Sequence, residues 1–321
     1  MATATPSTVA AEPPAAAAPR PPRRTRRRDR ATALPSRPTA TDLLHHALAA
    51  SVDELVRLDA VAREEADVEA VHQMRIAVRR LRSHLRTFAS FVDAAWSDSV
   101  REALAWLGDA LGARRDADIR TERLRSRAAS LPDPSLAAPL VEAMQREHLA
   151  AHESVLAVLG DPRYPALLAA LASFAAGVAP HPSLPAEALV APVQQQWERL
   201  RRRVRRLSDP PADAELHRIR IHAKRCRYAA EALEPLFGKD AARFASAAAE
   251  LQGVLGDLHD ACVMRAWLQS RSEADPALAF VAGEIAALEL AEIAAGRKAW
   301  RKPWKRLATR REPRQWKAPR A

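Results

Sequence analysis

Glycine and cysteine are scarce in this sequence, and each scarcity excludes a class of protein. The chain has 9 glycines among 321 residues and is rich in Ala, Leu, Arg and Glu. That composition favours an all-α protein, and no segment shows the alternation typical of strands. The two cysteines, Cys226 and Cys262, are too few for a disulfide framework. Both lie in helical patterns, so we predict buried, reduced thiols.

Long apolar runs are also missing. No stretch reaches the roughly 20 apolar residues of a membrane-spanning helix. The N-terminus is polar and rich in Ala and Pro, without the apolar core of a secretory signal. We therefore expect a soluble, cytoplasmic protein with no membrane contact.

Positive charge is present in excess but is unevenly distributed. The net charge is +11. Residues 1–40 contain 8 Arg and 2 acids, and residues 297–321 contain 11 Lys or Arg and 1 acid. Subtracting both ends leaves 31 basic and 36 acidic residues in 41–296, a net of −5. Charge in the body of the protein must therefore be segregated, and segregated charge concentrates the electrostatic potential.

Breaks at proline divide the chain into predicted elements. Residues 1–40, with RPPRRTRRRDR, are typical of a disordered basic tail. Thr41 is the expected N-cap of a helix through about residue 58. Further helices are predicted at about 71–88, 98–130, 135–160, 162–178, 193–207, 214–234, 240–271 and 276–300, with a Pro-rich connector at 179–192.

The segment VHQMRIAVRRLRSHLRTF (71–88) contains two stripes at helical spacing. The cationic stripe spans an arc of roughly 80° and consists of His72, Arg75, Arg79, Arg82 and Arg86. The apolar stripe lies about 110° round the axis and consists of Val71, Met74, Val78, Leu81, Leu85 and Phe88. No Asp or Glu occurs in the segment, although exposed helices usually interleave opposite charges. The cationic flank could face either bulk water, as a solvated face, or a cleft beside the core, and the missing acids indicate that its counter-charge comes from elsewhere.

The same pattern recurs in LHRIRIHAKRCRYAAEAL (216–233). Its histidine and cations match those of the first stripe at an offset of 145 residues, and LGARRDADI (111–119) matches LGDLHDACV (255–263) at an offset of 144. Nearly equal offsets predict a duplicated helical unit, with repeat 1 at about 41–178 and repeat 2 at about 193–306. Two such units packed face to face would form a body with pseudo-twofold symmetry, in which the basic stripes could face each other.

Two other basic segments follow the same design. In VQQQWERLRRRVRRL (193–207), Arg199, Arg202 and Arg206 lie beside an apolar stripe, and we expect this helix to form a third wall of the site. Near the C-terminus, we expect Lys302 and Arg306 to approach the site from the last helix, and 307–321 to be a basic tail. The basic tails are also suited to nucleic acid through phosphate contacts, and the C-terminal segment adds aromatic residues, Trp300, Trp304 and Trp316, for stacking.

Catalytic and metal-binding patterns are not found. The sequence has no GxxxxGK phosphate loop and no nucleophile–base constellation, so we expect no enzymatic activity and no cofactor. His72 and His217 lack a second ligand at i+3 or i+4, where arginine and isoleucine occur, so we expect no metal. Asp116 and Asp260 are interpreted as partners that orient basic side chains.

Taken in order, four motifs resemble the CHAD family, the conserved-histidine α-helical domain. They are H-x-x-R-I-x-x-R-R-L-R at 72–82, L-G-x-x-R-D-A-D-I at 111–119, L-H-x-x-R-I-x-x-K-R-x-R-Y at 216–228 and L-Q-x-x-L-G-x-L-x-D-A at 251–261. The resemblance covers about 41–306. It implies two four-helix bundles around a basic central channel that binds inorganic polyphosphate, and association with polyphosphate granules. The E-x-E-x-K signature of a fused CYTH triphosphatase is not found.

The predicted polyphosphate-binding residues share a place on or beside the basic stripes. They are His72, Arg75, Arg79, Arg80, Arg82, Arg86, Arg115, Arg199, Arg202, Arg206, His217, Arg220, Lys224, Arg225, Arg227, Tyr228, Lys302 and Arg306. The alternative hypothesis is a nucleic-acid-binding protein that uses the same helices and the tails. It would need aromatic rings for base stacking, and Tyr228 is the main candidate. A phosphohydrolase would need an acidic metal cluster, which is not found.

Overall fold

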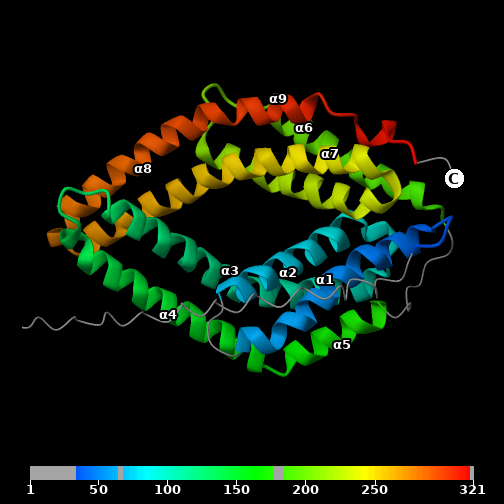
Figure 1. Cartoon of the computed structure of the whole chain (residues 1–321), viewed down its shortest axis with the longest axis horizontal. Helices are drawn as coiled ribbons and strands as arrows, with labels where there is room; N and C mark the ends of the chain where they lie inside the picture. The colour runs from blue at the N-terminus through cyan, green and yellow to red at the C-terminus, as the bar shows by residue number, and fades with distance from the viewer. Residues whose placement is uncertain (1–33, 64–67, 176–183, 319–321) are drawn as a thin grey trace, which may run out of the picture.

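The computed structural model describes residues 34–63, 68–175 and 184–318, and helices account for most of them (Figure 1). The helices are α1 (Ala40–Arg63), α2 (Val68–Thr87), α3 (Ala94–Ala128), α4 (Ala138–Gly160), α5 (Arg163–Ala175), α6 (Val190–Arg205), α7 (Asp213–Ala274), α8 (Ala279–Ala299) and α9 (Arg301–Ala308). Short 3-10 turns are η1 (Ala89–Phe91), η2 (Pro134–Ala137), η3 (Ala186–Leu189), η4 (Pro276–Leu278) and η5 (Pro313–Gln315). The described ranges contain no strand, only one isolated bridge between Thr39 and Pro185, so the all-α prediction is confirmed.

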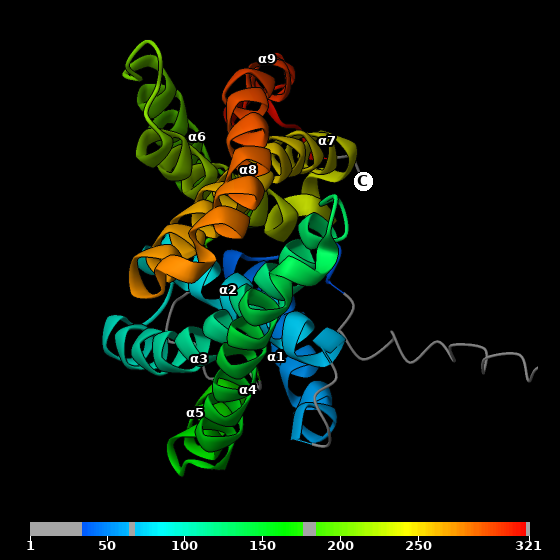
Figure 2. The same cartoon turned by 90° about the vertical axis from the view of Figure 1, so that its left-hand side faces the viewer.

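The helices form two groups that lie one above the other in Figure 1. Helices α1 to α5 form the lower group and α6 to α9 the upper group. Between the groups, α1 and α2 pack against α7, α2 also contacts α6, and α3 packs against α7 and α8. Figure 2 views the molecule from the end where α3, α4, α7 and α8 come together.

The apolar stripes read from the sequence form the main core. All six apolar stripe residues of α2 are buried, as are Leu216, Ile219, Ala223, Cys226 and Leu233 of α7. Complete burial of one Leu, Met or Phe side chain contributes about 2 kcal/mol. Because the apolar face is held in the core, the neighbouring cationic stripe is fixed in direction on each helix.

A second, smaller core closes the far end. Its largest side chains come from α3, α4, α7 and α8 and include Leu124, Met144, Trp267 and Ile285. Beside it, Glu289 of α8 is fully buried and accepts hydrogen bonds from Arg123 and Arg127 of α3. A buried carboxylate is tolerated only when it is paired, so these contacts fix α3 against α8.

Helix α7 joins two of the predicted helices. The sequence predicts helices at 214–234 and 240–271, and the structure has one element interrupted at Gly238. The φ of Gly238 is 50°, in the left-handed region that favours glycine. The first group makes the corresponding turn differently, since α2 ends at Thr87 and Asp93 caps α3 by accepting a hydrogen bond from the Trp96 amide.

The N-terminal boundary differs from the prediction. Helix α1 begins at Ala40 and ends at Arg63, and its cap is Thr39, not Thr41. Thr39 Oγ1 accepts a hydrogen bond from the Asp42 amide, while the Asp42 carboxylate accepts one from the Thr39 amide. Most of the predicted tail, residues 1–33, lies outside the described residues. Leu34 packs against the main core, whereas residues 35–37 are exposed.

The C-terminal segment also differs from the predicted tail. After α9, the Trp316 ring is buried against Phe237 and Phe244, with ring centroids 5.8 and 5.6 Å away. Arg201 of α6 pairs with Glu312, and Arg311 pairs with Asp240 of α7 at 3.1 Å. Residues 310–318 are therefore part of the folded body, because aromatic burial outweighs the charge pattern on which the prediction of a tail was based.

The order of helices is compatible with the predicted duplication. Gly112 lies against the guanidinium group of Arg75, and Gly256 lies against that of Arg220. The same contact thus occurs twice, between residues that correspond to each other at the offsets of 144 and 145. The duplication and its symmetry remain predictions. In the described part of the chain, no single helix is long and apolar enough to span a membrane, and the bent pair Pro134–Gly160 and Arg163–Phe174 passes on length and composition alone.

Candidate anion-binding site

The cationic stripe of α2 lies against α3. Arg75, Arg79 and Arg82 line a pocket whose other wall includes Gly108 and Gly112 of α3. A Cβ atom on Gly108 would lie 3.2 Å from Arg82 Nη1 and from the Val78 side chain. The glycines therefore allow α3 to approach the arginines closely, which forms the first section of the site.

A second, larger pocket spans the two helix groups. Arg79, Arg82 and Arg86 of α2 face Lys224 and Arg225 of α7 across a cavity of about 610 Å³, and Arg79 and Arg82 also belong to the first pocket. None of these five cations pairs with a carboxylate among the described residues. Asp98 and Glu102 also line the cavity, but Asp98 pairs with Arg101 at 2.8 Å. The cavity therefore carries an excess of positive charge.

Tyr228 joins the two stripes. Its hydroxyl accepts a hydrogen bond of 2.7 Å from Arg79 Nε, and its backbone carbonyl lies 3.2 Å from His84 Nε2. The side chain is 1% exposed, and the guanidinium groups of Arg79, Arg80 and Arg227 lie 5.5–5.9 Å from its ring centroid. Tyr228 therefore positions Arg79, and its ring is not accessible for the base stacking that the nucleic-acid hypothesis needs.

Lys224 is buried among other cations. Burial and the positive charges of Arg79, Arg220 and Arg75 lower the pKa of Lys224 to about 7, against the opposing effect of Asp116. Burial, together with Arg86 and Arg199, also lowers the pKa of Arg225. Such shifts mean that too little negative charge lies nearby to stabilise the protonated side chains. A bound anion would supply that negative charge.

The sequence predicts that Asp116 and Asp260 orient basic side chains, and the structure shows such a contact for Asp116. Asp116 accepts a hydrogen bond of 2.9 Å from Arg75. The corresponding Asp260 has no ion pair among the described residues, and burial raises its pKa. The two stripes are therefore matched in cations but differ in how the cations are compensated.

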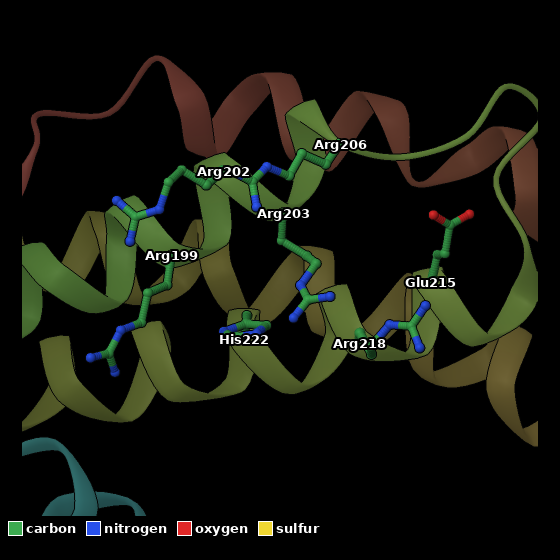
Figure 3. A pocket seen from close by; sticks show the side chains of 7 residues that line it. All are labelled: Arg199, Arg202, Arg203, Arg206, Glu215, Arg218 and His222. Carbon is green, nitrogen blue, oxygen red and sulfur yellow. The ribbon is translucent and has the colours of Figure 1, made fainter.

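Helix α6 and the first part of α7 form a separate groove (Figure 3). Arg199, Arg202, Arg203 and Arg206 lie on the α6 side, and Arg218 and His222 lie on the α7 side. Glu215 lies at the end far from Arg199. The sequence predicted α6 as a third wall of the central site. The structure corrects this, because the α6 arginines line a neighbouring groove and not the cavity between α2 and α7.

The structure brings most of the predicted residues into pockets. Those that line one are Arg75, Arg79, Arg82, Arg86, Arg199, Arg202, Arg206, His217, Lys224, Arg225 and Tyr228. Three more predicted residues adjoin these pockets: His72, Arg115 and Arg220. Burial is the main cause that lowers the pKa of His72, and Arg115, Arg79 and Arg75 add to it. Burial likewise lowers the pKa of His217, with a contribution from Arg220.

Four predicted residues lie elsewhere. Arg80 and Arg227 both pair with Glu231, at 3.4 and 2.7 Å, and neither lines a described pocket. Arg306 pairs with Glu250 of α7. Lys302 is exposed on α9 and lines none of the described pockets. Helix α9 packs on α7, and the prediction that it approaches the central site is wrong.

Several lining residues were missed. Arg203, Arg218 and His222 complete the groove, and Arg101 of α3 lines the central cavity. Arg218 and His222 lie four residues apart on α7, so helical spacing held a signal for them. Arg101 lies in a segment with mixed charges, where the sequence pattern gives no direction.

His217 lies in a fourth pocket with His259, whose ring centroid is 4.1 Å from its own. Burial is the main cause that lowers the pKa of His259 to about 4, with contributions from His217 and Arg220. Both rings are therefore neutral at pH 7, and the neighbouring cations disfavour a metal ion there.

Comparison with known proteins agrees with this architecture. The sequence matches the CHAD domain over residues 46–269. A crystal structure of the CHAD domain from the plant Ricinus communis is similar, with a TM-score of 0.75 and 28% identity over 89% of this chain and 97% of that one. PptA from Streptomyces chartreusis is similar with a TM-score of 0.70 and 25% identity, over 84% and 99% of the two chains. This chain therefore belongs to the CHAD domain family.

Two relatives in Mycobacterium tuberculosis are similar in sequence. They are the uncharacterized protein Rv2226 of strain H37Rv and the uncharacterized protein MT2285 of strain CDC 1551. Each is 30% identical over 244 residues, which cover 72% of this chain. The match spans 46% of the length of these relatives, about half.

Proposed function

We propose that this protein binds inorganic polyphosphate in the cavity between α2 and α7, and that it does so without catalysing a reaction. The observation that carries the proposal is the group of five cations, Arg79, Arg82, Arg86, Lys224 and Arg225, that converge from two helices without carboxylate partners. Arginine forks bind phosphate oxygens in pairs, and a helical stripe repeats about every 5.4 Å. The family resemblance implies the same ligand.

The shape of the site favours a single phosphate chain over a nucleic acid. A phosphate chain is slim enough to lie between packed helices, whereas a duplex is not. Single-stranded nucleic acid gains affinity from stacking on exposed aromatic rings. Tyr228, the aromatic residue at the cavity, is buried. Selectivity for polyphosphate is therefore part of the proposal.

A competition titration on the full-length protein tests it. Fluorescent polyphosphate is displaced by unlabelled polyphosphate, or by single- or double-stranded DNA of equal charge. We expect Arg79→Ala with Lys224→Ala to weaken binding about a hundredfold. The matched control is Arg205→Ala with Arg243→Ala, which removes the same charge from exposed positions outside the pockets and should change binding about twofold or less.

Two results would contradict the proposal. Equal competition by DNA would show a general polyanion binder, and equal losses in the two double variants would show that binding follows net charge alone. Circular dichroism of both variants checks that each is folded. Release of orthophosphate from polyphosphate above the level of a buffer blank would contradict the absence of catalysis.

The proposal extends to location. A protein that binds polyphosphate in this way is expected at polyphosphate granules in the cytoplasm. A fluorescent fusion should coincide with granules, and the Arg79→Ala and Lys224→Ala variant should become diffuse. A diffuse distribution of the unchanged protein in cells that contain granules would contradict it.

A further inference from the structure

The groove between α6 and α7 concentrates arginines that have no protein counter-charge. Arg199, Arg203, Arg206 and Arg218 form no ion pair among the described residues, and Arg202 has only a distant one with Glu198 at 3.7 Å. Some exposed arginines elsewhere on the surface are paired, for example Arg57, Arg163 and Arg297 with neighbouring acids. Others, such as Arg125 and Arg146, have no ion pair in the described part of the chain but line none of the described pockets, so the groove differs in gathering five arginines in one place. Like charges that converge without partners repel each other, so this groove is suited to an anion.

The groove also contains one carboxylate and one histidine, and the carboxylate, Glu215, offsets the charge of Arg218 at one end only. Glu215 is engaged at one end, where it accepts hydrogen bonds from the Ser208 hydroxyl and the Ala212 amide. Burial, with Arg225, Arg203 and Arg199, lowers the pKa of His222 to about 4. His222 is therefore neutral at pH 7, and its buried Nδ1 has no hydrogen-bond partner among the described residues. The groove therefore holds five guanidinium groups against one carboxylate.

Arg225 connects the groove to the central cavity. It lines the cavity between α2 and α7, and the charges of Arg86 on one side and Arg199 on the other both act on it. Lys224 and His222, two residues apart on α7, face the cavity and the groove respectively. The cations of the two sites therefore form a continuous path.

Among its described residues, the first helix group has no equivalent of this groove. At the offset of 145 residues, Arg218 corresponds to Gln73 and His222 corresponds to Ala77, which is 2% exposed. On α1, the arginines pair with acids of the same helix, Arg57 with Glu54 and Arg63 with Asp59. The cationic path thus extends beyond the central cavity on one side only.

We propose that the α6–α7 groove is a second section of the polyanion site, which binds the phosphates of a long chain that extend past the central cavity. This inference rests on the proposed function. At 1.5 Å per residue, the stripe from Arg75 to Arg86 spans about 16 Å, and the stripe from Arg199 to Arg206 adds about 10 Å. Chains that reach the groove should bind more tightly than chains that only fill the cavity.

The test is a series of binding titrations from tripolyphosphate to long-chain polyphosphate with the full-length protein. The groove variant carries Arg203→Ala and Arg218→Ala, one change on each wall. We expect unchanged affinity for the shortest chains and about tenfold weaker binding of long chains. For long chains, the plot of log affinity against log salt concentration should become less steep by about 1.4, which is about 0.7 for each of the two lost phosphate contacts.

Two comparisons keep the outcomes separate. The Arg205→Ala and Arg243→Ala control should retain the full preference for long chains, and the Arg79→Ala and Lys224→Ala variant should lose affinity at every length. The inference is overturned if the groove variant binds long chains as the unchanged protein does, or if it weakens all lengths alike. If the unchanged protein binds no polyphosphate of any length, the proposed function itself fails.

Discussion

Two regions at matching positions solve the same packing problem with different chemistry. On α3, Arg114 is 1% exposed and donates to Asp118 at 3.0 Å. At the offset of 144 residues, α7 has Leu258 and Cys262 instead. A buried ion pair and a Leu–Cys pair thus occupy positions that the sequence offset matches, and Cys262 is partly buried beside Asp213. The difference teaches that the ion pair is not needed for packing, since a buried pair recovers little more than its desolvation cost.

The same regions differ in the cations that face the site. Arg79 corresponds to Lys224, and Arg115 corresponds to His259. Arginine remains protonated under all ordinary conditions, whereas the pKa of Lys224 is lowered to about 7 and that of His259 to about 4. At these matched positions the first helix group carries a constant charge, whereas in the second the charge of Lys224 depends on pH near neutrality.

The largest expected effect concerns the buried pair. Arg114→Leu alone leaves Asp118 buried with His148 as its remaining partner, at 2.8 Å. We expect a loss of about 3–5 kcal/mol in the free energy of unfolding. The double change Arg114→Leu with Asp118→Cys copies the second region and should recover most of the loss. Denaturant titrations of the three proteins measure this, and a double variant as unstable as the single one would show that the regions are not interchangeable.

The next effect concerns Lys224 and pH. The group is mostly neutral above pH 7 and charged below it, and an anion binds the charged form more tightly. Polyphosphate affinity should therefore rise as the pH falls from 8 to 6, by up to about tenfold. Lys224→Arg should flatten the profile. A profile that stays equally steep in this variant would assign the pH dependence to another group or to the terminal phosphates of the ligand.

The smallest effect concerns the unequal carboxylates. Asp116 holds Arg75 and also acts on Lys224, so its negative charge opposes anion binding. Asp116→Asn should strengthen polyphosphate binding about threefold. Asp53→Asn, on the exposed face of α1, removes the same charge away from the pockets and serves as control. Weaker binding in Asp116→Asn would mean that Asp116 mainly keeps Arg75 in position.

Helices and stripes were predictable because both follow from local spacing. The apolar positions of α2 and α7 are buried as the 3.6-residue period requires, and this fixes the direction of the neighbouring cations. The errors arose where distant contacts decide. Arg80 and Arg227 lie on or beside the same stripes, yet Glu231 compensates both. Trp316 packs a segment whose composition is typical of a tail.

By itself, the sequence determined an all-α protein with two equivalent cationic stripes and an excess of arginine over local acids. Helical periodicity is a property of the chain, and it needs no knowledge of neighbours. Only the tertiary structure decided which cations share a pocket. The division between the central cavity and the α6–α7 groove depends on how α2, α6 and α7 pack, because side chains distant in sequence either neutralise a cation or leave it free for an anion.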